Sequence, residues 1–157
     1  MAFFEIPGLK NHEMAFAALV AAALDAIRNA TTTTPLTRKA IASVPDSPGI
    51  YAIFKDGTLD YAGESGCLKE RVRDLFLTRN HSYRRTLGAD EFGDWPGYAP
   101  ASTKQAFACD IETALTKYYA EHLSILWVPV RFGRKEIEEG FVAAGWQLRN
   151  KRGQRGM

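Results

Sequence analysis

The chain has 157 residues and a mass of 17.4 kDa, and 46% of its residues are hydrophobic while 24% are charged. These values are typical of one globular domain and exclude a wholly disordered or fibrous protein. The net charge of +2 neither indicates nor excludes a nucleic-acid partner, because phosphate binding depends on where the charges lie. Cys67 and Cys109 form no disulfide framework and no CxxC metal motif, so we expect free thiols in a cytoplasmic protein.

Residues 1–46 are predicted to form an N-terminal helix and a linker. Residues 10–30 are Ala-rich and helical in pattern, and the segment TTTTP at 31–35 interrupts the helix because Thr and the residue before Pro disfavour it. The longest apolar run, at 14–24, is about half of what spans a bilayer, so we expect no membrane partner. The Ala-rich face of the helix fits either a cover for the sheet or a contact with a second copy or a recruiting protein.

The strongest local signal is a β-hairpin. Residues 49–55 (GIYAIFK) are apolar and rich in strand-forming residues, and Asp56-Gly57 is a favoured two-residue turn between paired strands. The returning strand is predicted at 58–63 (TLDYAG). The hairpin therefore places one tyrosine, Tyr51 or Tyr61, on each of two paired strands.

Apolar spacing and turn residues predict the remaining elements: a helical turn at 36–43, helices at 67–79, 80–88, 104–122 and 134–147, a loop at 89–102, and a third strand at 124–132. Ser102 or Thr103 is the expected cap of the helix at 104–122. Pro129 favours an edge position or a bulge for the third strand, because proline donates no backbone hydrogen bond. The predicted fold class is α/β (α+β): a sandwich with a small three-stranded, largely antiparallel sheet flanked by helices. Residues 151–157 are predicted to be a basic, mobile tail.

Residues 47–150 carry a spaced set of motifs. The tripeptides Gly49-Ile50-Tyr51 and Tyr61-Ala62-Gly63 stand on the paired strands, Arg71 follows ten residues after the second tyrosine, and Glu138 precedes Asn150 by twelve. In this order and spacing the region resembles the GIY-YIG nuclease family. It departs from the family in having YAG for YIG and Gln147 where a proline is often found before the asparagine. The resemblance implies a GIY-YIG-like sandwich for residues 47–150.

The resemblance also implies roles. Tyr51 becomes the candidate general base and Tyr61 the residue that positions water or phosphate. Arg71 becomes the phosphate clamp, Glu138 the ligand of a single Mg²⁺ or Mn²⁺ ion, and Asn150 a positioning residue. These residue types suit phosphodiester hydrolysis, since a guanidinium binds phosphate oxygens and a carboxylate is a hard ligand for such a cation. A tyrosine with its ordinary pKa near 10 is a poor base unless a neighbouring charge lowers that value.

Each assignment has an alternative that involves no catalysis. Tyr51 and Tyr61 fit a cross-strand aromatic pair, and Arg71 fits a solvated basic helix face. Asn150 fits a helix C-cap. Glu136 and Glu139 neighbour Glu138, and helical spacing separates those two from the face that Glu138 occupies.

The near-neutral net charge hides two opposed segments. Residues 69–85 carry a net charge of +4, and residues 86–121 carry −4. A basic stretch just after Tyr61 lies where a phosphate backbone would pass. The residues predicted to contact nucleic acid are Lys69, Arg73, Arg79, His81, Tyr83, Arg84 and Arg85, with Tyr83 suited to stacking on an unpaired base.

Together these patterns predict a metal-dependent endonuclease that hydrolyses DNA through a tyrosine, arginine and glutamate site. A non-catalytic nucleic-acid-binding module on the same fold is one alternative, and a protein-interaction domain is another. DNA binding separates the last from the first two, and metal-dependent nicking separates those two from each other.

Overall fold

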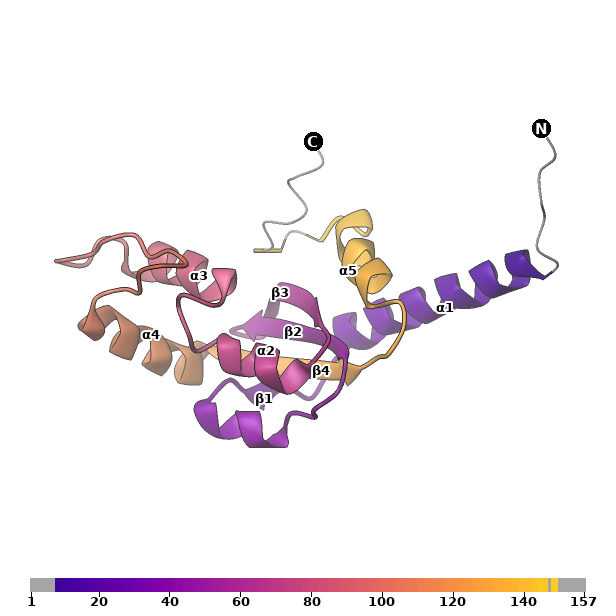
Figure 1. Ribbon diagram of the computed structural model, residues 1–157, viewed down its shortest axis with the longest axis horizontal. Helices are drawn as coiled ribbons and strands as arrows, with labels where there is room; N and C mark the ends of the chain where they lie inside the picture. Colours follow the sequence, from indigo (N-terminus) through magenta and orange to yellow (C-terminus); the bar gives the residue numbers. More distant parts are fainter. Residues whose placement is uncertain (1–7, 147, 150–157) are drawn as a thin grey trace.

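The computed structural model describes residues 8–146, 148 and 149 (Figure 1). Its helices are α1 (Leu9–Arg28), the 3-10 helix η1 (Arg38–Ser43), α2 (Leu68–Asp74), α3 (Ser82–Phe92), α4 (Cys109–His122) and α5 (Arg134–Ala143). Its strands are β1 (Thr34–Pro35), β2 (Gly49–Lys55), β3 (Thr58–Ser65) and β4 (Leu123–Pro129). The α+β class predicted from the sequence is confirmed.

The sheet has four strands in the order β1-β4-β2-β3, and every neighbouring pair is antiparallel. The prediction of three strands is therefore wrong by one. The additional strand, β1, lies in the segment predicted as a linker, where its two residues pair with Ser124 and Ile125. Thr34 suits a strand, and Pro35 is tolerated because β1 is a short edge strand.

β4 lies inside the sheet, between β1 and β2, and not at the edge that Pro129 suggested. Pro129 is the last residue of β4 and pairs with Gly49 of β2, whereas β1 reaches only Ser124 and Ile125. Pro129 has no backbone N–H to donate to a strand on the β1 side of β4, but β1 does not extend as far as Pro129. A strand interior to a sheet accepts proline at its end for this reason.

Several helix boundaries differ from prediction: α2 ends at Asp74 and α5 at Ala143, five and four residues earlier than predicted. α3 continues to Phe92, into the predicted loop, and α4 begins at Cys109, five residues later than predicted. Ser102 does not cap a helix: its hydroxyl accepts the backbone N–H groups of Lys104 and Gln105 in a local turn. Such side-chain turns compete with helix for the same backbone donors.

The sheet is buried on both faces, which makes the molecule a three-layer sandwich. Tyr51 and Ile53 of β2 face a core shared with α2, α3 and α4, while Ile50, Ala52 and Phe54 face a core shared with α1 and α5. This alternation follows from the two-residue period of a strand. β3 is an edge strand, and α5 lies against it.

Candidate active site

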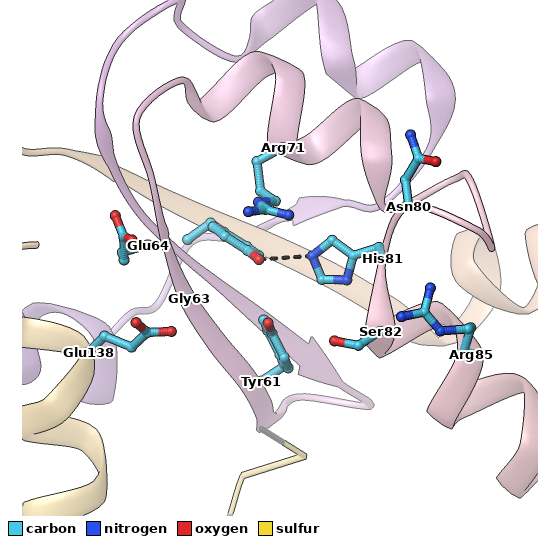
Figure 2. Close-up of a pocket in the computed structure, with 10 residues that line it drawn as sticks. Tyr61, Gly63, Glu64, Arg71, Asn80, His81, Ser82, Arg85 and Glu138 are labelled. Carbon is cyan, nitrogen blue, oxygen red and sulfur yellow. Dashed lines mark hydrogen bonds between the residues drawn. The ribbon is translucent and has the colours of Figure 1, made fainter. Parts of the chain in front are cut away.

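A polar cavity of about 170 Å³ opens beside edge strand β3, between α2, α3 and α5 (Figure 2). Its lining contains two tyrosines, three potentially cationic side chains and two carboxylates. The residues are Tyr51, Tyr61, Gly63, Glu64, Arg71, Asn80, His81, Ser82, Arg85 and Glu138. Four of the five residues predicted to be catalytic thus line one cavity.

The hairpin places the two tyrosines side by side. Tyr51 pairs with Gly63 and Ile53 with Tyr61, and a register shift after Ile53 leaves Asp60 without an opposite residue. The ring centroids of Tyr51 and Tyr61 are 5.8 Å apart. A Cβ atom on Gly63 would lie 2.8 Å from the Tyr51 hydroxyl oxygen, so glycine is required where the Tyr51 ring crosses the strand.

His81 holds the Tyr51 hydroxyl. Its Nε2 atom lies 2.9 Å from the hydroxyl oxygen, and its Nδ1 accepts the backbone N–H of Tyr83 at 3.1 Å as the N-cap of α3. Because Nδ1 is an acceptor, the single ring proton of the neutral imidazole is assigned to Nε2, which donates to Tyr51. The Tyr51 oxygen is therefore an acceptor in this bond and keeps its own proton.

Burial determines the charge state of this pair. Tyr51 and His81 are each 2% exposed. Burial, followed by the influence of Tyr61, raises the pKa of Tyr51 well above 10, and Arg71 opposes this shift. Burial, followed by the positive charges of Arg71 and Arg85, lowers the pKa of His81 from 6.5 to about 3. Both groups are therefore neutral at pH 7.

Arg71 gives the cavity a permanent positive charge. It is half-buried on α2, whose apolar residues Leu68 and Val72 anchor the helix to the core. Lys69 and Arg73 are four residues apart and share the opposite side of this helix, since two residues along a helix turn about 200°. Of the three basic residues on α2, Arg71 alone lines the cavity.

Glu138 reaches the cavity from α5. Ile137 and Phe141 fix α5 in the second core, and Arg134 fixes its first turn by donating to the carbonyl of Ser65 at 2.7 Å and pairing with Glu64 at 3.6 Å. Glu138 is half-buried, whereas Glu136 and Glu139 are exposed. Among these three carboxylates, Glu138 is the one that lines the cavity.

The donor set fits a hard divalent cation with few protein ligands. Within the described residues no group of three or more His, Cys, Asp or Glu side chains forms a metal cage. Mg²⁺ commonly uses one or two carboxylates and fills its remaining positions with water and phosphate oxygens. Glu138 supplies such a carboxylate, and the Glu64 carboxylate on the same wall is already paired with Arg134.

Two residues predicted to contact nucleic acid are buried, so those predictions are wrong. Arg84 is 1% exposed and donates to Glu112 at 2.8 Å and to Thr116 at 3.0 Å. Tyr83, also 1% exposed, donates its hydroxyl to Asp60 at 2.9 Å and cannot stack on a base. A buried guanidinium needs a charged partner, which explains why Glu112 is half-buried.

The other basic candidates lie in different places around the cavity. Arg85 lines it and braces the α2–α3 connection by donating to the carbonyls of Thr78 at 2.8 Å and Arg79 at 3.0 Å. Arg79 is exposed on that connection, next to the rim residue Asn80. His81 contacts Tyr51 and does not lie on the outer surface, a role that the sequence analysis missed.

Asn150, Gln147 and the tail at 151–157 lie outside the described residues. Arg149, at the end of the described part, pairs with Asp60 at 3.1 Å and with Asp90, tying this segment to β3 and α3. None of the helices in the described ranges has the length and apolar character needed to cross a membrane.

Comparison with known proteins adds no assignment, because no family model, curated protein or solved structure matches this chain.

Proposed function

We propose that this protein is a metal-dependent endonuclease that hydrolyses DNA phosphodiester bonds at the cavity beside β3. The resemblance of its two tripeptides to the GIY-YIG family motivates the proposal. The observation that carries it is the convergence of Tyr51, Tyr61, Arg71 and Glu138 on one polar cavity. These residues come from the hairpin and from two helices, α2 and α5, that follow it at different distances along the chain.

The side chains divide the chemistry between them. Arg71 binds the scissile phosphate and stabilises the charge that grows on its oxygens, as a permanently charged guanidinium can. Tyr61, half-buried at the cavity wall, orients water or a phosphate oxygen through its hydroxyl. Glu138 holds the divalent cation, Mg²⁺ or Mn²⁺, which when bound would supply Lewis acidity to the phosphoryl group.

Tyr51 is better suited to orienting and donating than to taking a proton. Its raised pKa keeps the phenol protonated at pH 7, and the His81 Nε2–H fixes the hydroxyl oxygen in place. A base role would require the positive charge of a bound cation to lower that pKa. A pH–rate profile that is flat from pH 6 to 8 is expected from the orienting role.

A non-catalytic DNA-binding module is the second candidate. The neutral state of Tyr51 and His81 favours this candidate. At pH 7 neither side chain is in a form that would take a proton from an attacking water. The carboxylate of Glu138 favours catalysis, since an acid repels phosphate unless a cation lies between them.

The test is nicking of supercoiled plasmid in Mg²⁺ or Mn²⁺ by the native chain, Glu138→Gln and Glu136→Gln. Glu136 is exposed on the same helix and provides the matched control. We expect Glu138→Gln to lower the nicking rate by about a hundredfold or more while DNA affinity stays within about threefold. Glu136→Gln should behave as the native chain does.

Full nicking by Glu138→Gln would contradict the assignment of the cation to this residue. DNA binding without cleavage of duplex, flap or single-stranded substrates by the native chain would establish the binding module instead.

A further inference from the structure

The N-terminal half of α1 presents an apolar surface that the rest of the described chain leaves exposed. α1 contacts the second core through Val20, Ala23, Leu24 and Ile27, all in its C-terminal half. Its N-terminal half projects beyond the sheet (Figure 1), and Met14 is 66% exposed there. The alanines at positions 15, 17, 18, 21 and 22 are exposed as well.

The middle of the helix is apolar on every side, whereas its first turns carry polar and charged residues. Residues 14–24 include no charged and no polar side chain. A helix of that kind is normally buried against protein. A membrane surface is a poor match, because helices that lie on membranes carry Lys and Arg along one polar face, and α1 balances two basic residues against two acidic ones.

The charges at the two ends of α1 indicate which protein covers it. Lys10 lies in the first turn, and Asp25 lies in the last turn together with Arg28, whose guanidinium lies over the Trp146 ring. An antiparallel copy of α1 brings Lys10 beside Asp25 at both ends and so adds two ion pairs. The exposed surface is therefore electrostatically complementary to itself.

The spacing of side chains fits the same arrangement. Met14, Ala18, Ala21 and Asp25 follow one another at intervals of four, three and four, the period at which two packed helices meet. With Lys10 opposite Asp25, Met14 falls opposite Ala21, so a large side chain meets a small one. The face they form is turned away from the buried residues of α1, about 135° around the helix.

We propose that two copies of this chain associate through an antiparallel pair of α1 helices, with the two-fold axis between Ala17 and Ala18. The contact leaves the candidate active site open, because α1 covers one face of the sheet and the cavity residues Tyr51 and Tyr61 belong to the other. The association does not depend on the proposed nuclease function.

Sedimentation velocity over a range of concentrations tests the proposal on the full chain. The native chain should dimerise, and Ala18→Glu should make it monomeric by placing two carboxylates at the axis. Ala18 is exposed in the single chain, so its substitution should leave folding intact. Ala26→Glu, an exposed alanine rotated away from this face, is the matched control and should leave the dimer unchanged.

A charge exchange tests the antiparallel register. Lys10→Asp and Asp25→Lys should each weaken dimerisation by about tenfold, and the double variant should restore native affinity. The proposal is overturned if the native chain stays monomeric, or if it binds anionic vesicles and does not dimerise. A dimer that resists Ala18→Glu, or a double variant that fails to recover, overturns it as well.

Discussion

The two faces of the β2–β3 hairpin share a backbone and differ in almost everything else. On one face Ile50 and Ala52 meet the apolar residues of α1 and α5 and are fully buried. On the other face Tyr51 is equally inaccessible, yet its hydroxyl is bonded to His81 at the wall of a polar cavity. Burial therefore stabilises the fold on the first face and sets the charge state of candidate catalytic groups on the second.

The difference shows that burial alone does not separate core from site. The pKa values of Tyr51 and His81 move away from 7 in opposite directions because both groups are buried in a neutral form. Among the described residues, the buried members of the core on the apolar face are all apolar and carry no titratable group. Substitutions on the two faces should consequently affect different measurements.

The largest effect on stability is expected on the apolar face. Ile50→Ala removes buried methyl and methylene groups and should lower the free energy of unfolding by about 2–5 kcal/mol. Tyr51 and Tyr61 belong to the core on the other face of the sheet, so we expect the folded fraction to keep its DNA affinity. Urea unfolding and binding anisotropy measure the two quantities; a large affinity loss with unchanged stability would show that the faces are not separate.

On the cavity face, Gly63→Ala should cost about 1–3 kcal/mol, because the added Cβ meets the Tyr51 ring at 2.8 to 3.0 Å. It should also displace the Tyr51 hydroxyl and lower the nicking rate. Gly66→Ala is the control: its Cβ would meet only the Arg134 guanidinium at 3.8 Å. Equal thermal unfolding curves for the two variants would contradict the close approach of Tyr51 to β3.

The neutral state of His81 predicts a pH dependence of stability. Its folded pKa of about 3 lies below the unfolded value of 6.5, so the unfolded chain alone takes up this proton between those values. The stability that neutral His81 contributes is present above pH 6.5 and is lost as the pH falls toward 3, by at most about 1.4 kcal/mol per pH unit. His81→Asn retains a capping side chain and should flatten that slope; an unchanged slope would show that His81 is charged in the folded protein.

The smallest expected effect concerns the route of DNA across the surface. Arg79→Gln, beside the cavity rim, should reduce the slope of log affinity against log salt by about 0.9 if one phosphate contact is lost. Arg73→Gln, on the far side of α2 from Arg71, should leave the slope unchanged. The reverse result would place the DNA on the other side of α2.

The sequence was informative where the signal was local. Asp56-Gly57 and the alternation of apolar residues were sufficient to predict the hairpin, and with it the neighbouring positions of Tyr51 and Tyr61. The separation of Glu138 from Glu136 and Glu139 followed from helical geometry alone. These predictions depend on residues close together in the chain.

The errors concern contacts between distant segments. A sequence shows six basic residues at 69–85 but does not show that Arg84 turns inward to Glu112, twenty-eight residues away. Nor does it show that His81 meets Tyr51, thirty residues earlier. β1 escaped prediction because two residues become a strand only when β4 lies beside them.

The central claim, that the cavity holds a catalytic cation through Glu138, is tested most directly by Mn²⁺ titration monitored by electron paramagnetic resonance in the presence of a short DNA duplex. The native chain and Glu136→Gln should bind a single ion per chain, and Glu138→Gln should lose about a hundredfold in Mn²⁺ affinity. Native Mn²⁺ affinity in Glu138→Gln would contradict the account.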